Sequence, residues 1–385
     1  MRYIKAILRK VKFYLFFIIA VIVKKRRNDV WIISERGTDA RDNAYFFSKW
    51  MSKNHPEIKV WYVIDNKSPD YEKLEKNIRT VQTNSFRHYL IYCEAAIRIS
   101  THAWGGDIPI PDYYKKSLFR KFDKHKFIFL QHGIIKDYLP GLTYPIIKPD
   151  IFICSAKPEY DYVKGSFGHP EGVVKYTGLA RFDNLHNHIE KNQILIMPTF
   201  RKWLQGISLN EFLDSEYFMK WNAVLNDPDL CSLLKAYDLE LVFYPHYEIQ
   251  KYVSYFKSES QYIKIADINN YDVQQLLMES KILITDFSSV FFDFAYMRKP
   301  VIYYQFDREN YVKNHYNYTK GYFDYDTMGF GKVVSSLNEL VDEIGTCVDQ
   351  SCKLVGKYNE QVEKFFELYD QNNCERIYQE IQKIL

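Results

Sequence analysis

The chain has 385 residues, of which 47% are apolar and 17% aromatic, which is enough for two globular domains and too apolar for a disordered scaffold. No internal repeat is visible, which excludes a solenoid. The formal net charge of +4 is uneven, because residues 1–27 hold nine Lys or Arg and no acidic residue. The rest of the chain carries 43 basic and 48 acidic residues, a net of −5, so its charge indicates no groove for nucleic acid.

The N-terminal segment has an apolar centre between two basic clusters. Residues 13–23 are eleven apolar residues in a row, which is fewer than the ~20 that cross a bilayer. No small-residue cleavage site of a secretory signal follows them. We expect residues 1–28 to form a helix in the interface of the anionic inner leaflet, with apolar side chains among acyl chains and basic ones against head groups. A helix packed on the protein's own surface is the alternative.

From residue 30 onward, short apolar runs alternate with longer amphipathic stretches, the pattern of a parallel sheet wound with helices. The polar stretch 186–193 separates two such halves, so we expect Rossmann-like domains over residues 29–187 and 188–385 that face each other across a cleft. No Gly-x-Gly-x-x-Gly follows a strand, so a dinucleotide redox cofactor is not indicated. The runs that predict strands are 30–33, 60–64, 96–99, 127–130, 151–154, 194–197, 241–244, 282–284 and 301–304.

The most informative segment is 281–304, in which a buried strand leads into a hydroxyl-rich turn, a short helix and a second buried strand. Thr285, Asp286, Ser288 and Ser289 offer oxygens at the start of that helix, where the first N–H groups lack intrahelical partners and favour an anion. The pattern is therefore typical of a phosphate site. A plain N-cap role for one of the two serines is the alternative.

Further polar motifs occur along the chain, nearly all of them just after a predicted strand, at the edge where α/β sheets bind ligands. The neutral imidazole of His132 suits a general base, and Gly133 lets the backbone approach a substrate closely. The planar guanidinium of Arg201 suits bidentate contact with phosphate, and His246 can donate to the same group. The motifs are Gln131-His132-Gly133, Gly178-Leu-Ala-Arg181-Phe-Asp183, Pro198-Thr-Phe-Arg201 and Tyr244-Pro-His246.

In this order the motifs resemble those of the CDP-glycerol glycerophosphotransferases, the bacterial enzymes that prime and polymerise teichoic acids and related capsule polymers. The run Thr285-Asp-Phe-Ser-Ser-Val-Phe-Phe-Asp-Phe is similar to the family signature, and residues 34–37, 42–43, 307–311 and 320–325 also agree. The resemblance covers roughly residues 30–345. Gln131, Ala180 and Lys320 depart from the family pattern, which leaves the acceptor and the alditol of the donor open.

The resemblance implies a GT-B fold and transfer of glycerol phosphate from CDP-glycerol to a hydroxyl of a lipid-linked saccharide or growing polymer, with release of CMP. His132 would be the base, and His246 would act at the leaving phosphate. One alternative is that the donor is CDP-ribitol or another nucleotide donor. A second is that the protein is an inactive membrane assembly subunit. Asp286 would orient His246 or bind a ribose hydroxyl. The residues that would serve the donor are Gly133, Arg181, Arg201, Thr285, Asp286, Ser288 and Ser289.

Nothing in the sequence requires a cofactor or a metal. Asp324-Tyr-Asp326 has the spacing of a metal-binding carboxylate pair, which keeps Mg²⁺ as an alternative, but in the family this block resembles a loop near the donor. Six scattered Cys without zinc spacing predict reduced thiols. The expected place of the protein is the cytoplasmic face of the cell membrane, attached peripherally, and a homo-oligomer stays open.

Overall fold

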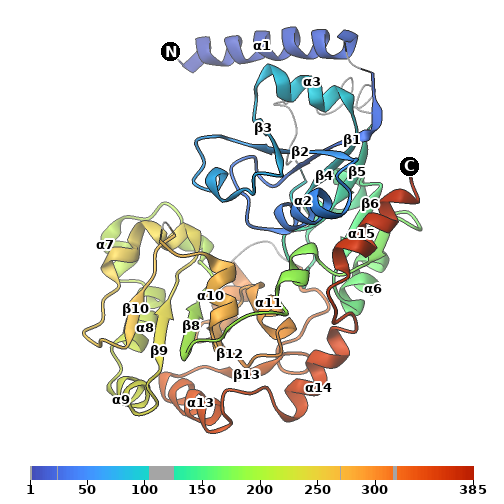
Figure 1. Cartoon of the computed structure of the whole chain (residues 1–385). Helices are drawn as coiled ribbons and strands as arrows, with labels where there is room; N and C mark the ends of the chain where they lie inside the picture. The colour runs from blue at the N-terminus through green and yellow to red at the C-terminus, as the bar shows by residue number, and fades with distance from the viewer. Residues whose placement is uncertain (1, 24, 104–124, 269, 315–318) are drawn as a thin grey trace. The chain divides into compact units, whose positions relative to one another are not determined.

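The computed structural model describes residues 2–23, 25–103, 125–268, 270–314 and 319–385 (Figure 1). The chain divides into two compact units. Unit 1 comprises Met1–Ile134, Pro140–Asn184 and Asp370–Leu385, and unit 2 comprises Ile135–Leu139 and Leu185–Tyr369. Each unit is a Rossmann-like α/β domain with a parallel sheet of its own, which is the composition of a GT-B-like fold.

The sheet of unit 1 has the strand order β3-β2-β1-β4-β5-β6-β7, and every pairing is parallel. The order reverses between β1 and β4, so ligands are expected beyond the carboxyl ends of these two strands. The strands are β1 Arg27–Ser34, β2 Lys59–Ile64, β3 Arg79–Gln82, β4 Ala95–Ser100, β5 Lys126–Phe129, β6 Ile151–Cys154 and β7 Val174–Tyr176. The helices are α1 Arg2–Val23, α2 Asn43–Asn54, α3 Phe86–Glu94, α5 Tyr144–Ile147, α6 Lys157–Ser166 and α15 Asn373–Gln382, with 3-10 turns η1 Tyr71–Lys73, η2 Pro140–Leu142 and η3 Ala180–Asn184.

The sheet of unit 2 has the order β10-β9-β8-β11-β12-β13, again parallel, and it reverses between β8 and β11. The strands are β8 Gln193–Met197, β9 Glu240–Phe243, β10 Ile263–Ile265, β11 Ile282–Thr285, β12 Val301–Tyr304 and β13 Gly331–Val334. The helices are α7 Leu209–Leu213, α8 Glu216–Leu225, α9 Pro228–Ala236, α10 Val273–Glu279, α11 Val290–Tyr296, α12 Arg308–Asn314, α13 Leu337–Asp349 and α14 Gly356–Phe365, with 3-10 turns η4 Lys202–Leu204 and η5 Tyr247–Tyr255.

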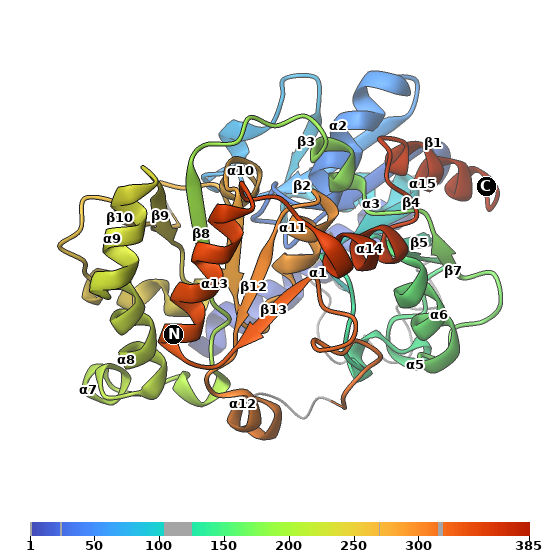
Figure 2. The ribbon, with the colours of Figure 1, turned by 90° about the horizontal axis from the view of Figure 1, so that it is seen from below.

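Helices cover both faces of the second sheet, as the alternation of side chains along β12 shows. Ile302 and Tyr304 join the core that α8, α9 and α13 close, and Figure 2 shows α13 beside β12 and β13. Tyr303 points to the other face and packs edge-on against Phe291 of α11, with ring centroids 5.1 Å apart. Strands covered on both faces are continuous apolar runs, which explains why the sequence revealed them.

Two segments depart from the domain boundary predicted at residue 187. The last helix, α15, packs in unit 1, where the Tyr378 ring stacks on His55 at 3.8 Å and lies 5.9 Å from Trp50. Residues 135–139 belong to unit 2. There the Tyr138 N–H bonds the Thr319 carbonyl at 3.1 Å, and a Cβ on Gly321 would lie 2.1 Å from the Lys136 carbonyl oxygen.

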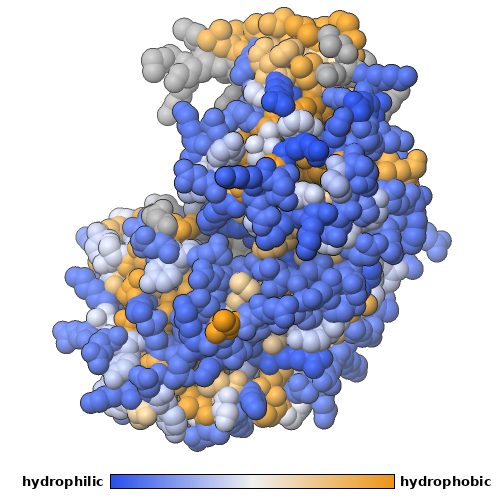
Figure 3. Space-filling view, viewed as in Figure 1, coloured by the Kyte–Doolittle hydropathy of each residue, from blue (hydrophilic) through white to orange (hydrophobic). Residues whose placement is uncertain are grey.

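Helix α1 packs on α3 with one face and leaves an apolar face open. Phe13 and Ala20 are buried, and the Phe16 ring meets Phe86 at 5.0 Å and Tyr89 at 5.4 Å. The packing considered as the alternative is therefore present on one side of the helix. The open face forms the hydrophobic band over α1 in Figure 3 and includes Ile7, Val11, Leu15, Ile18 and Ile22. No helix within the described ranges is long and apolar enough to span a bilayer.

Candidate functional site

Side chains that follow β4 and β5 meet in unit 1, next to the point between β1 and β4 where the strand order reverses. His102 follows β4, and His132 follows β5. Their rings stack in parallel, with centroids 5.0 Å apart and an interplanar angle of 10°. His132 was predicted from its motif. His102 was not, although its position just after a predicted strand was a usable signal.

Both ring nitrogens of His102 have partners. Arg36 Nε donates to His102 Nε2 at 3.2 Å, so the ring proton is on Nδ1, which lies 2.9 Å from Thr101 Oγ1. Burial, His132 and Arg36 lower the pKa of His102 to about 3. His102 is therefore neutral at physiological pH, and its acceptor nitrogen is already occupied by Arg36.

The surroundings of His132 also favour the neutral ring. Its pKa lies below the ordinary value because the packed surroundings disfavour the charged form. Asp42 raises this pKa, whereas the cations Arg181 and Arg36 lower it further. The stack on His102 covers one face of the ring, and the residue still keeps exposed surface. A neutral, accessible imidazole is the form that takes up a proton.

The backbone before His132 is held in the left-handed region. Gln131 has φ +60° and is 1% exposed. The side-chain amide of Gln131 donates to the Ile153 carbonyl and, at 3.3 Å, to Glu159 Oε1. Its backbone carbonyl accepts from Asn43 Nδ2 at 2.8 Å. A non-Gly residue in such a conformation costs about 1–3 kcal/mol. These buried bonds offset that cost and fix the turn that presents His132.

Arg181 connects this turn with α2. Its Nη1 bonds Asp42 Oδ1 at 2.7 Å and the His132 carbonyl at 3.1 Å, and its backbone N–H bonds Asn43 Oδ1 at 3.1 Å. The residue is only 8% exposed. The sequence placed Arg181 on the donor, whereas these contacts give it the task of positioning His132.

The flanking residues of the Arg181 motif are structural. Asp183 accepts from the backbone N–H groups of Asn373 and Cys374, both at 2.9 Å, and so caps the start of α15. Gly178 has φ +84°, and a Cβ there would lie 1.6 Å from Asn373 Oδ1. This close approach requires glycine.

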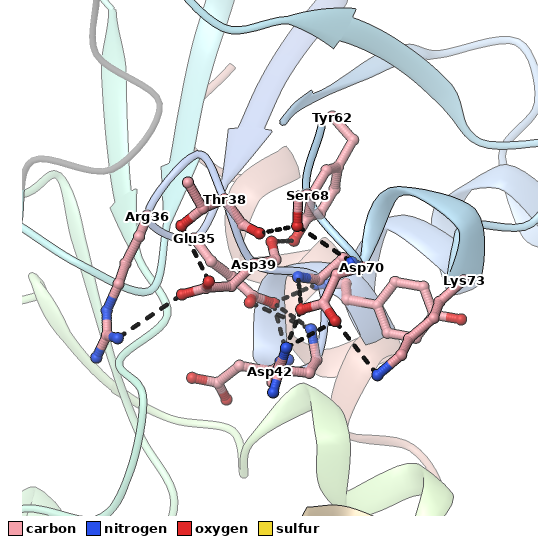
Figure 4. Close-up of polar contacts among 12 residues, drawn as sticks. Glu35, Arg36, Thr38, Asp39, Asp42, Tyr62, Ser68, Asp70 and Lys73 are labelled. Carbon is pink, nitrogen blue, oxygen red and sulfur yellow. Dashed lines mark hydrogen bonds and ion pairs between the residues drawn. The ribbon is translucent and has the colours of Figure 1, made fainter. Parts of the chain in front are cut away.

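The loop between β1 and α2 is tied down by two buried carboxylates (Figure 4). Glu35 accepts from the N–H groups of Asp42 at 2.8 Å, Arg41 at 3.2 Å and Tyr45 at 3.3 Å. Burial and the nearby Asp42 raise the pKa of Glu35 to about 8. Asp70 holds the Arg41 guanidinium by two bonds of 2.7 Å. The loop that carries Arg36 and Asp42 is thereby fixed.

In unit 2 the ends of β8, β11 and β12 meet in a buried ionic network around Arg201. Arg201 is 0% exposed, and its Nε and Nη2 bond the two oxygens of Asp307 at 2.7 and 2.9 Å. Its Nη1 lies 2.8 Å from Asp286 Oδ2 and 2.6 Å from the Thr199 carbonyl. Although burial acts against the charged form, Asp286 and Asp307 raise the pKa of Arg201 above its ordinary value.

This network leaves little room for the direct phosphate contact that the sequence predicted for Arg201, because the guanidinium is enclosed and its partners are protein groups. Asp286 Oδ1 accepts from the Thr199 N–H at 2.8 Å, and Thr285 Oγ1 donates to the Met197 carbonyl at 2.6 Å. All three side chains thus join β8 to β11. Their partner Asp307 was not recognised in advance, although it lies in a block that agrees with the family.

Ser288 and Ser289 keep their hydroxyl groups at the surface of the same edge. Ser289 is the N-cap residue of α11, but its side chain makes no capping bond. Ser288 Oγ accepts only a long bond of 3.5 Å from the Val290 N–H. Ser289 therefore does not play the plain N-cap role considered as the alternative, and Ser288 makes only this long capping-type bond.

His246 follows β9 and has a defined proton position. Its Nδ1 accepts from the Glu248 N–H at 3.2 Å, so in the neutral ring the proton lies on Nε2. The ring stacks on Phe200 with centroids 4.7 Å apart. The half-buried ring is thus held as a hydrogen-bond donor at the carboxyl edge of the sheet.

A pocket of about 230 Å³ opens beside this edge in unit 2. Arg308 pairs with Asp326 at 2.9 Å, and Lys320 pairs with Asp324 at 3.1 Å, so the two carboxylates with metal-like spacing face cations. Within the described part of the chain, no group of three or more His, Cys, Asp or Glu could hold a metal ion. The aromatic lining is Phe287, Tyr311, Phe323 and Tyr325, and the charged lining is Lys136, Asp137, Arg308, Lys320 and Asp324.

Comparison with known proteins decides the family. Residues 15–383 match the model of the CDP-Glycerol:Poly(glycerophosphate) glycerophosphotransferase family. The chain belongs to this family. This confirms the resemblance found in the motifs.

Curated relatives of the chain are named for teichoic acid synthesis. It is 35% identical over 368 residues to the minor teichoic acid biosynthesis protein GgaB of Bacillus subtilis, covering 92% of the chain and 40% of that protein. It is 23% identical over 315 residues to a teichoic acid poly(glycerol phosphate) polymerase of Staphylococcus epidermidis, covering 72% and 40%. The chain therefore spans about 40% of the length of these curated relatives.

Among solved structures, the wall teichoic acid polymerase TagF superposes on this chain with a TM-score of 0.71 at 20% identity, covering 100% of this chain and 97% of that one. UDP-GlcNAc 2-epimerase from Neisseria meningitidis gives a TM-score of 0.52 at 12% identity, covering 92% and 99%. These likenesses confirm the predicted GT-B-like fold class.

Proposed function

We propose that this chain transfers glycerol phosphate from CDP-glycerol to a hydroxyl of a growing teichoic-acid-type polymer or its lipid-linked primer, releasing CMP. The observation that carries the proposal is the neutral His132, presented after β5 and stacked on His102 in a chain of the glycerophosphotransferase family. A base is what an acceptor hydroxyl needs, because the attacking oxygen must lose its proton.

In the proposed reaction the acceptor oxygen attacks the β-phosphorus of CDP-glycerol while its proton passes to His132. The bond from that phosphorus to the bridging oxygen breaks, and CMP leaves with the bonding electrons. His246 donates from Nε2 to the phosphate oxygens, on which negative charge grows. The Ser288 and Ser289 hydroxyls contribute further donors. Arg201 supports this edge from inside rather than touching the donor.

The pocket beside α12 is the proposed place of the cytidine part. Phe287 and Tyr311 stack at 3.7 Å and, with Tyr325, give the pocket aromatic walls. A nucleobase gains from such walls, whereas a glycerol phosphate chain has no flat ring to stack on them. The carboxylates Asp137 and Asp324 can accept from an amino group or from ribose hydroxyls.

We infer that helix α1 attaches the protein to the cytoplasmic face of an anionic membrane. Five apolar side chains spaced three or four residues apart, from Ile7 to Ile22, lie exposed on one face. Lys10 and Lys12 flank Val11 on that helix and are exposed, so their ammonium groups can reach head groups while their stems lie along the apolar band. A lipid surface matches both the apolar face and the charge.

The test is CMP release by the purified chain with CDP-glycerol and a lipid-linked acceptor, run beside CDP-ribitol. Acceptor-dependent CMP release with CDP-glycerol, at least tenfold faster than with CDP-ribitol, supports the proposal. A faster reaction with CDP-ribitol would reassign the donor. An absence of CMP release with either donor and with both saccharide and polymer acceptors would contradict the proposal.

A further inference from the structure

Arg36 combines exposure with a fixed position. Its side chain is 63% exposed, yet Nε is anchored on His102 Nε2 at 3.2 Å, and Nη1 lies 3.7 Å from Asp39 Oδ2. Figure 4 shows the side chain extending away from the carboxylates around Asp70. Most exposed arginines lose rotamer entropy when they bind, whereas this one is already ordered.

The anchor of Arg36 is the same imidazole that stacks on the base. Because His102 is neutral and accepts at Nε2, it orients the Arg36 guanidinium, and its ring lies parallel to His132 at 5.0 Å. Arg36 also acts on the charge state of His132. A group bound to Arg36 would therefore sit close to the hydroxyl that His132 deprotonates.

The charges around His132 favour an anion at Arg36. Arg181 is buried and paired with Asp42 at 2.7 Å, so these two charges offset each other. Within the described ranges, the carboxylate that Arg36 meets is Asp39, at a loose 3.7 Å, and no bond is made by its Nη2. Its guanidinium can thus present two donors to a phosphate group.

We propose that Arg36, oriented by His102, binds a phosphate of the acceptor, so that the chain prefers acceptors ending in a polyol phosphate over neutral saccharide ends. The inference rests on the proposed function and names the acceptor class for it. In a glycerol phosphate chain the terminal hydroxyl and the last phosphodiester are separated by the three carbons of one glycerol. The hydroxyl can then face His132 while the phosphate meets Arg36.

The same phosphate chemistry is present in the diphosphate of the donor, and the two sources give different kinetics. Turnover is measured with the full chain and two soluble acceptors, a short-chain saccharide lipid and the same lipid bearing one glycerol phosphate. Arg36→Ala should raise KM for the phosphate-bearing acceptor by about 10- to 100-fold, as loss of a charge-assisted contact does, and leave KM for CDP-glycerol and for the neutral acceptor within twofold.

Arg36→Lys should restore part of the loss, because it keeps the charge without the fork. In wild type, KM for the phosphate-bearing acceptor should rise with ionic strength, and this dependence should disappear in Arg36→Ala. The matched control is Arg79→Ala, which removes another exposed arginine of unit 1, on β3, and should change none of these values.

Two results would overturn the inference while leaving the proposed function in place. One is a raised KM for CDP-glycerol in Arg36→Ala, which assigns the arginine to the donor. The other is equal KM values for both acceptors in wild type and variant. Should the chain release no CMP at all, calorimetric titration of the phosphate-bearing lipid into both proteins decides separately, since equal affinities would contradict the role of Arg36.

Discussion

The Arg181 guanidinium reaches the carboxylate of Asp42 at 2.7 Å across 139 positions of sequence. The same Nη1 holds the carbonyl of His132 at 3.1 Å. The pair therefore fixes the position of His132 and contributes to the electrostatic field at its ring. Asp42 is the anion that acts on the His132 ring, and Arg181 and Arg36 are the cations that oppose it.

The pH dependence of turnover should reveal this field. Asp42 raises the pKa of His132, so Asp42→Asn should lower that pKa further and move the acid limb of kcat/KM to lower pH. Wild type should already show its acid limb below pH ~6.5, the ordinary value for histidine. Asp161→Asn, which changes an exposed carboxylate on α6 of unit 1, is the matched control and should leave the limb in place. A shift of the Asp42→Asn limb toward higher pH would refute the assignment of His132 as the titrating base.

Removing the imidazole of the base should separate catalysis from donor binding. His132→Ala is expected to lower kcat by about 10² to 10⁴, the usual effect of losing a general base. Affinity for CDP-glycerol, measured by calorimetry, should stay within several-fold because the base acts on the acceptor. His188→Ala, which changes a half-buried histidine of unit 2, should keep wild-type turnover. Near-normal activity of His132→Ala would show that another group takes the proton.

Substitutions of Arg201 and Ser288 should have different effects, one on stability and the other on nucleotide binding. Arg201→Met leaves Asp286 and Asp307 buried without their cation, and breaking such a pair typically costs about 3–5 kcal/mol of unfolding free energy. Urea denaturation should therefore show a marked loss for Arg201→Met and almost none for Ser288→Ala. Calorimetry should show weaker CDP-glycerol binding for Ser288→Ala at unchanged stability. If the Arg201→Met protein is stable but binds the nucleotide more weakly, the direct phosphate contact expected from the sequence would be supported instead.

The open face of α1 should control attachment to lipid. Deleting the helix would uncover Phe86 and Tyr89, so substitutions on the exposed side are the cleaner test. Leu15→Glu with Ile18→Glu should abolish flotation with anionic liposomes, because each adds a charge where apolar contact is expected. Met219→Glu is the control, since it changes an exposed apolar residue of unit 2. Equal flotation of all three proteins would place the attachment elsewhere.

The strands that could be predicted from sequence are the inner ones. Each predicted run corresponds to an observed strand, whereas β3, β7, β10 and β13 were not expected. These four are the outermost strands of the two sheets. An outer strand is short and partly exposed, so it lacks the continuous apolar run that identifies a strand buried on both faces.

The same limit applies to the candidate site. His132, His246 and the serine pair could be found because their motifs follow inner strands directly. The setting of Arg201 could not, because its main partner, Asp307, lies 106 positions away and only the fold encloses the pair. The place of α15 was missed for a related reason. The bonds from Asp183 that fix the helix in unit 1 span 190 positions of sequence.

Gly321 lies where the fold leaves no room for a side chain. The loop glycine is only half-buried, a position at which substitution is ordinarily neutral. Here the Lys136 carbonyl occupies the place of the first side-chain carbon, and Lys136 stands four positions after His132 in the chain. A mutation to alanine would push against the backbone that continues from the base. The mutational tolerance of this loop is therefore set by a segment nearly two hundred residues earlier.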